Sequence, residues 1–131
     1  MGGKKILIVD DDPDICQGMR VRLEYSGYAT CFAADALSGV AAASKEEPDL
    51  IVLDLGLPAG DGFLLIERLK THPTLGVIPI IVVSARDARA NRERAIKAGA
   101  TAYLQKPVDN AEFLAVIRQA LVAFTSVSLP E

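Results

Sequence analysis

Short apolar runs alternate with helical patterns along this chain, and the alternation limits the folds open to it. Three runs, residues 6–9, 50–53 and 78–83, are apolar at consecutive positions, as in strands buried on both faces of a parallel sheet. Two weaker runs, 29–33 and 102–105, also fit strands. Because a helical pattern follows each run, the chain reads as βα repeated five times, which predicts a doubly wound α/β fold with a five-stranded parallel sheet.

The helical patterns differ in the apolar surface that they offer to a sheet. The last pattern has a single apolar stripe, made of Phe113, Val116, Ile117, Ala120, Leu121 and Phe124, which predicts a well-packed helix. The second is Ala-rich around Leu37, Val40 and Ala41. The fourth, residues 87–98, is rich in Arg and has few large apolar residues beyond Ile96. We expect this fourth helix to be weakly anchored, either as a solvated face or as a mobile element of a switch.

Composition places the chain among ordinary globular proteins. Its 131 residues are 50% hydrophobic and 24% charged, which predicts one domain over residues 1–124, with 125–131 as a tail or the start of a linker. The net charge of −3 argues against direct binding of nucleic acid or an anionic membrane. Because neither a spanning apolar segment nor a signal peptide is evident, we expect a cytoplasmic protein, with Cys16 and Cys31 as small buried apolar residues.

Three consecutive acids, Asp10, Asp11 and Asp12, follow the first apolar run. Asp12 precedes Pro13, and Asp at the N-cap with Pro at the first helical position is a common start of a helix. Asp10 and Asp11 have no such structural task. They lie at the carboxyl end of the first strand, where open α/β sheets bind their ligands, and a hard divalent cation would relieve their repulsion.

Other strands also end on polar side chains. Asp54 closes "LIVLD", Ser84 closes "IIVVS" and Lys106 follows "AYLQ". If the first and third strands are neighbours, Asp54 joins Asp10 and Asp11 in a site of the kind that Mg²⁺ occupies with carboxylates, waters and phosphate oxygens. The pattern therefore predicts a phosphoryl site with one carboxylate nucleophile.

Four motifs together, "ILIVDDDPDI", "PDLIVLDLGLPAGDG", "IIVVSA" and "GATAYLQKPV", resemble the receiver domain of two-component response regulators. The resemblance extends over residues 4–121, nearly the whole chain. It implies a flavodoxin-like fold with strand order 2-1-3-4-5 and five flanking helices. The residues themselves predict five strands but not their order.

The resemblance also implies a role for each residue at the strand ends. Asp54 would be the phosphoacceptor, Asp10 and Asp11 would hold Mg²⁺ together with it, and Gly56 would add a backbone carbonyl to the metal. Metal positioning and charge neutralisation would then carry most of the catalysis of phosphoryl transfer from an activated phosphohistidine.

Four further residues would bind the phosphoryl group or respond to it. Lys106 would pair with phosphoryl oxygens as a point charge, and the Ser84 hydroxyl would donate to one of them. Pro107 resembles the cis proline of the family. Tyr103 would turn from a more exposed to a more buried rotamer after phosphorylation, and the face around Arg89, Arg92 and Tyr103 would become a docking surface.

The phosphoryl donor must be another protein, a histidine kinase or a phosphotransfer protein, because the single histidine, His72, lies in a turn without acids or cysteines nearby. A downstream protein or an attached effector domain would read the output. The chain departs from common family patterns at Val108, where an aromatic residue is frequent, and at Thr101 and Ala102, where one transcription-factor subfamily has an acidic pair for its dimer. Asp61 fits a turn or a cap better than a ligand.

Two other classes of protein remain open at this stage. A receiver-like docking module would bind partners without being phosphorylated. A Mg²⁺-dependent phosphohydrolase would use the same Asp54 nucleophile, but Gly56 stands two residues after Asp54 where such an enzyme would need a second Asp as its acid. We therefore expect a signalling domain, not an enzyme acting on other substrates.

Overall fold

The computed structural model describes residues 3–57 and 61–128, and the side chains among these except those of residues 61 and 124–128. The predicted burial of Phe124 and the predicted turn or cap role of Asp61 therefore lie outside the described residues.

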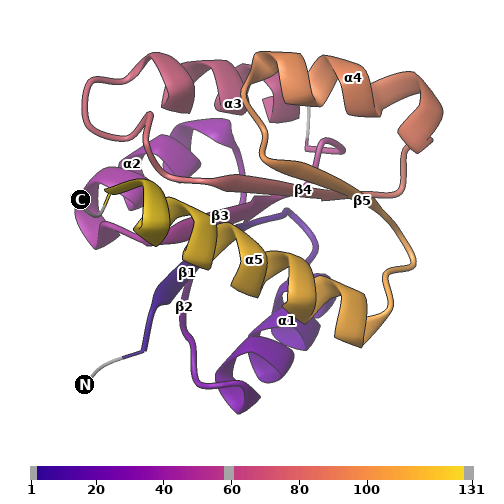
Figure 1. Ribbon diagram of the computed structural model, residues 1–131. Coiled ribbons are helices and arrows are strands. Elements are labelled where there is room, and N and C mark those ends of the chain that lie inside the picture. Colours follow the sequence, from indigo (N-terminus) through magenta and orange to yellow (C-terminus); the bar gives the residue numbers. More distant parts are fainter. Residues whose placement is uncertain (1–2, 58–60, 129–131) are drawn as a thin grey trace.

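Five parallel strands form one sheet in the order β2-β1-β3-β4-β5 (Figure 1). The strands are β1 (Lys5–Val9), β2 (Ala29–Ala33), β3 (Leu50–Leu53), β4 (Ile80–Ser84) and β5 (Ala102–Gln105). The central strands β1, β3 and β4 are buried on both faces, as their continuous apolar runs predict. The predicted fold class and strand order are confirmed.

Helices cover both faces of the sheet. They are α1 (Pro13–Tyr25), α2 (Ala36–Glu46), α3 (Asp61–Thr71), α4 (Ala88–Ala98) and α5 (Asn110–Ser128). One apolar core lies between the sheet and α2, α3 and α4, and a second lies between the sheet and α1 and α5 (Figure 1). The stripe of α5 packs as predicted, with Phe113 and Ile117 almost fully buried.

The fourth strand begins two residues later than the apolar run predicts. The run was expected to form a strand over 78–83, whereas β4 spans Ile80–Ser84. Pro79 has no N–H to give to a sheet, and its carbonyl instead accepts a hydrogen bond from the Ile51 amide. The shift brings Ser84, which has no exposed surface, into the strand itself.

Helix α2 packs on the core through its small residues and not through Leu37, its largest apolar residue. Leu37 is 77% exposed, and the buried residues are Ala36, Gly39 and Ala43. A Cβ at Gly39 would lie 3.2 Å from a methyl group of Leu65, so the glycine lets α3 pack close to α2. Small residues, rather than large ones, make this helix contact.

The prediction that both cysteines are buried is wrong. Cys16 and Cys31 are only partly buried, although each packs beside one of the two cores. Each thiol points at a backbone carbonyl, Cys16 at that of Asp10 and Cys31 at that of Ile6. Partial burial raises the pKa of both thiols, so they are poor nucleophiles at neutral pH.

Helix α4 has little apolar anchorage, as its sequence predicts. Ala95 is its one fully buried residue, and Ile96 is 43% exposed. The contact that the sequence pattern missed is made by Arg94, whose guanidinium lies 3.8 Å from the ring centroid of Phe63 in α3. This cation–π contact ties α4 to the buried Phe63 through a charged side chain of α4 rather than an apolar one.

Two observations concern the ends and the exterior of the molecule. The backbone of α5 continues to Ser128, beyond the boundary at residue 124 that the sequence pattern gave for the domain. None of the described helices is both long enough and apolar enough to span a membrane.

Candidate phosphoryl and metal site

The strand order brings four polar residues to the carboxyl edge of the sheet. Asp10 follows β1, Asp54 follows β3, Ser84 ends β4 and Lys106 follows β5. Strands β1 and β3 are direct neighbours, and the Asp54 amide donates to the Val9 carbonyl at 3.1 Å. The acids that lie 44 residues apart in the chain are therefore held side by side by the backbone ladder.

Three carboxylates converge at this edge. One oxygen from each of Asp10, Asp11 and Asp54 lies within 4.8 Å of the others. Carboxylate oxygens are the ligands that hard divalent cations prefer, and the spacing leaves room for one such ion between them. The donor set fits Mg²⁺.

Lys106 is the cation that faces these carboxylates. Its Nζ lies 3.4 Å from Asp10 Oδ2 and 3.5 Å from Asp54 Oδ2. The side chains of Asp10, Asp54 and Lys106 are 2%, 14% and 20% exposed, so this charge cluster is largely shielded from solvent. The single Lys106 ammonium offsets only part of the negative charge of the three acids, so the site remains net negative.

Asp10 is the most buried of the acids, with 4% of the residue exposed. Burial raises its pKa above the usual value, and the nearby Asp54 charge adds to that effect. The Asp12 amide, which donates to Asp10 Oδ1 at 2.9 Å, and the Lys106 ammonium act in the opposite direction without cancelling it. A buried carboxylate of this kind is costly to ionise unless a cation joins it.

Asp12 does not belong to the site. Its Oδ1 accepts from the Asp14 amide at 2.9 Å and the Ile15 amide at 3.4 Å, with Pro13 at the first helical position. It therefore caps α1, as the Asp-Pro sequence predicts. The three consecutive acids divide into a helix cap and two residues that face the site.

Gly56 lies close to Asp54 in a way that the sequence does not reveal. Its amide donates to Asp54 Oδ1 at 3.0 Å, and a Cβ at this position would lie 3.3 Å from Asp54 Oδ2. Glycine thus keeps the space beside the carboxylate open. The role of its carbonyl as a metal ligand remains a prediction.

A chain of hydrogen bonds runs from Ser84 to Tyr103 through the backbone of Arg86. The Arg86 amide donates to Ser84 Oγ at 3.1 Å, and the Arg86 carbonyl accepts from the Tyr103 hydroxyl at 2.8 Å. Sequence reasoning missed Arg86 as a link, because its contribution comes from main-chain atoms. The structure does not have the more exposed Tyr103 that we expected before phosphorylation, since this residue is only 2% exposed.

Two other residues singled out in the sequence have plain structural settings. The Lys106–Pro107 peptide bond is cis. His72 Nδ1 accepts hydrogen bonds from the amides of Thr74 and Leu75, so His72 orders the turn after α3. It is not among the residues of the carboxylate site.

The family model of the response regulator receiver domain matches residues 6–118. The chain belongs to this family. A phosphorylatable aspartate and bound Mg²⁺ are standard features of this family. The acidic cluster at the edge of the sheet agrees with these features.

Individual relatives agree with this assignment. The "DNA-binding dual master transcriptional regulator RpaA" of Synechocystis is 39% identical over 117 residues, which cover 89% of this chain and 48% of that protein. A CheY-like receiver domain from Methanospirillum hungatei has a TM-score of 0.87 and 33% identity, with 97% of this chain and 100% of that chain covered. This receiver domain spans about half the length of several curated relatives that it matches.

One solved relative bears on the metal. The receiver domain of sensor histidine kinase PA1611 from Pseudomonas aeruginosa has a magnesium ion coordinated in its active site cleft. It is 28% identical to this chain with a TM-score of 0.83, and the match covers 92% of this chain and 98% of that one. The acidic trio of this receiver domain offers the same kind of ligand.

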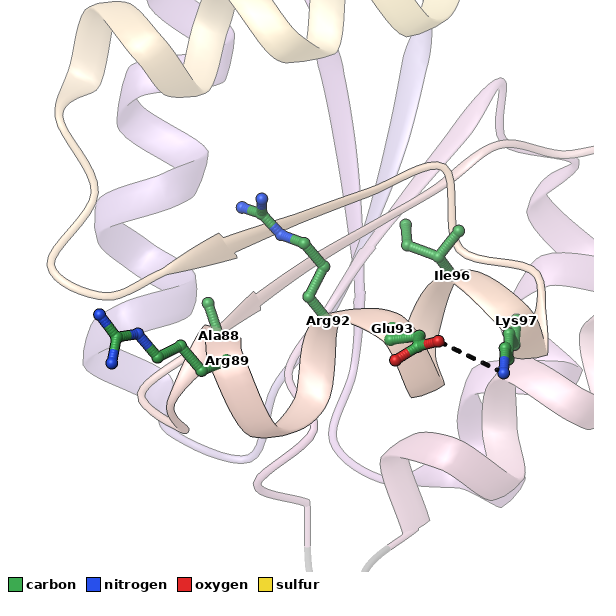
Figure 2. A pocket seen from close by; sticks show the side chains of 6 residues that line it. All are labelled: Ala88, Arg89, Arg92, Glu93, Ile96 and Lys97. Carbon is green, nitrogen blue, oxygen red and sulfur yellow. Dashed lines mark ion pairs between the residues drawn. The ribbon is translucent and has the colours of Figure 1, made fainter.

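A groove of about 530 Å³ lies along α4 of the receiver domain. It is lined by Ala88, Arg89, Arg92, Glu93, Ile96 and Lys97 (Figure 2). Arg92 also donates to the Tyr103 carbonyl at 3.1 Å, so the groove is bonded to the same residue that ends the Ser84 chain. Glu93 and Lys97 form an exposed ion pair at 3.4 Å.

Proposed function

We propose that this receiver domain accepts a phosphoryl group on Asp54 from a histidine kinase or a phosphotransfer protein and that the modification alters partner binding. The observation that carries the proposal is the pairing of one ammonium group, Lys106, with both Asp54 and the buried Asp10. Asp54 is the more exposed of these two carboxylates, and an incoming donor can approach it.

The transfer would form a P–O bond to an Asp54 carboxylate oxygen while the P–N bond of the donor phosphohistidine breaks and its imidazole leaves. Lys106 would pair with the phosphoryl oxygens, and the buried Ser84 hydroxyl would donate to one of them. The Gly56 amide, which already donates to Asp54, would hold the other carboxylate oxygen. These groups orient the acceptor and balance charge as it moves.

Asp10, Asp11 and Asp54, with the Gly56 carbonyl, would hold Mg²⁺. When bound, the ion would supply positive charge to the acids and to the phosphoryl oxygens. The raised pKa of Asp10 supports this assignment, because a buried carboxylate without a full counter-charge is a place where a cation is stabilising.

The signal would pass from Ser84 through Arg86 to Tyr103 and then to the α4 groove. Tyr103 is already inward in the structure, so phosphorylation would stabilise this arrangement rather than create it. Allosteric coupling of this kind is typically worth about 1–3 kcal/mol. The α4 groove would then be the surface whose partner affinity changes, whether the partner is a separate protein or an effector domain in the same chain.

Intact mass spectrometry after incubation with a small acyl phosphate and Mg²⁺ tests the acceptor. We expect one phosphoryl group per molecule, none in Asp54→Asn, and none when the metal is chelated. Undiminished labelling in Asp54→Asn would contradict the assignment. Absence of labelling in the folded wild type would instead favour a docking module that is not phosphorylated, and continuous release of phosphate from phosphate esters would favour a phosphohydrolase.

The two kinds of acid can be separated by a matched pair of variants. Asp11→Ala should weaken Mg²⁺ binding strongly with little effect on folding, because Asp11 is exposed and one of three ligands. Asp12→Ala should leave the metal affinity nearly unchanged and cost about 1 kcal/mol of stability through the lost helix cap. Calorimetric Mg²⁺ titration and urea unfolding measure the two effects, and equal metal affinity in wild type and Asp11→Ala would refute the division.

A further inference from the structure

The two edge strands of the sheet are protected differently. On β5, the Tyr103 carbonyl accepts from Arg92, and the Gln105 side chain accepts from the Ala88 amide, so two residues of this strand are bound to α4. Strand β2 has the sequence ATCFA, without charge or proline. Charged residues and prolines are the usual means by which proteins prevent an edge strand from pairing with another chain.

The register of β2 identifies the groups that face outward. The Ala29 amide donates to the Lys4 carbonyl, and the Ala33 carbonyl accepts from the Asp10 amide, so alternate residues of β2 point toward β1. Since successive residues alternate in direction, the N–H and C=O groups of Thr30 and Phe32 point away from the sheet. These two N–H and two C=O groups are therefore spaced so that they can form hydrogen bonds with an added antiparallel strand.

We propose that β2 pairs with β2 of a second copy of this chain, antiparallel and about a two-fold axis at Cys31. In this register Thr30 of one copy lies opposite Phe32 of the other, and the two pairs form four main-chain hydrogen bonds. The five-stranded sheets become one continuous ten-stranded sheet. The proposal does not depend on phosphorylation of Asp54.

A groove at the end of the same strand supports this occupant. It has a volume of about 440 Å³ and is lined by Phe32, Ala33 and Ala34 from the β2 end, by α1 residues that include Pro13, and by the site carboxylates Asp10 and Asp11. Phe32 is 42% exposed there. The proposed register places Tyr28 of the second copy opposite Ala34, so the exposed part of this aromatic side chain lies beside the apolar residues at the β2 end of the groove.

Charge on the flanking helix is complementary under the same two-fold axis. The α1 flank of β2 carries Arg20 and Glu24, which pair within one chain at 3.6 Å, and Glu24 accepts from Thr30 on the strand. The two-fold axis brings the Arg20–Glu24 pair of one copy against the same pair of the other copy, so each charge can face a charge of opposite sign.

The strand is short, so the interface is at the small end of specific contacts and the dimer should be weak, with a Kd of roughly 0.1–1 mM. Sedimentation equilibrium from about 10 µM to 1 mM should show a monomer–dimer equilibrium. Phe32→Lys should raise the Kd at least tenfold. Leu64→Lys, at an apolar residue of α3 with a similar exposure of 40%, is the control and should not change it.

Cross-linking reports the register. Copper phenanthroline in air, which oxidises neighbouring thiols to a disulfide, should join two chains of Cys16→Ser through Cys31, because the register places Cys31 opposite its own copy, and should fail in Cys31→Ser, which retains Cys16. The yield in Cys16→Ser should fall in parallel with dimer content when Phe32→Lys is added. A chain that is monomeric throughout the concentration range would overturn the proposal, as would a dimer that survives Phe32→Lys or that is lost on Ile96→Asp in the α4 groove.

Discussion

Asp10 carries a charge that the folded chain alone does not fully compensate. Burial is the main cause of its raised pKa, and Lys106 offsets only part of the effect. A carboxyl group whose pKa is higher in the folded state than in the unfolded state favours folding when it is protonated. Its contribution is complete below the unfolded value, near 3.8, and is lost as the pH rises through the raised folded pKa.

Asp10→Asn should therefore stabilise the metal-free protein at neutral pH, by an amount on the order of 1 kcal/mol. The gain should shrink as the pH falls toward 3.8, where the wild-type carboxyl becomes protonated. Urea unfolding of both proteins across this range, without divalent metal, measures the difference. Asp11→Asn is the control at an exposed neighbour, and a destabilised Asp10→Asn at neutral pH would show that the Lys106 pair outweighs burial.

The residue scale also shows what the sequence could predict about the site. Asp10, Asp54, Ser84 and Lys106 each follow or end an apolar run, so their common edge was predictable from the strand pattern. The main-chain links were not, because the Arg86 amide and carbonyl carry no sequence signal. The sequence predicted an inward Tyr103 only after phosphorylation, and its inward position without a phosphoryl group was missed, since burial depends on a hydroxyl partner that only the folded loop supplies.

At the scale of elements, α4 is held by polar and cationic contacts more than by apolar burial. The Arg94 guanidinium stacks on Phe63, and the Lys70 side chain of α3 runs beneath Gly99 at the end of α4. The Lys70 ammonium donates to the carbonyls of Gly76 and Ile78, both at 3.0 Å, and its partial burial lowers its pKa. Such an anchor suits the proposed switch, in which α4 would shift, because few apolar contacts would have to be broken.

Gly99 is the position where this anchor can be tested. Its φ of +124° is unfavourable for residues with a side chain, and a Cβ would lie 2.5 Å from Lys70 Cγ. Gly99→Ala should therefore lower the free energy of unfolding by roughly 1–3 kcal/mol. Gly18→Ala is the matched control in a helix, since a Cβ there meets no atom within 4 Å, and it should be neutral or slightly stabilising. Thermal and urea unfolding compare the two.

Element boundaries were predictable to within a few residues where periodicity was strong. The apolar stripe of α5 and the runs of β1 and β3 needed no tertiary information. The start of β4 was misplaced, because Ile78 and Pro79 are buried without belonging to the strand. Helix α2 faces the core with Gly39 rather than with Leu37, because Leu65 of α3 approaches closely at Gly39. This contact lies far away in the sequence, so the local pattern of α2 could not predict it.

At the scale of the whole molecule, two cores on opposite faces hold the sheet fixed while the carboxyl edge and α4 are less constrained. The central strands are buried on both faces, and the acids at their ends are therefore held by a rigid base. The response to phosphorylation should be confined to the segment from β4 to the residue after β5. Helix α1 beyond its first turn should not take part.

Hydrogen exchange with and without beryllofluoride and Mg²⁺, a mimic of the phosphoryl group, tests this central claim most directly. Residues 84–106 should become more protected in the wild type, because the mimic stabilises the inward Ser84–Arg86–Tyr103 arrangement, while residues 17–25 of α1 should not change. Asp54→Ala should abolish the response. Unchanged exchange across residues 84–106 with the mimic bound at Asp54 would contradict the account.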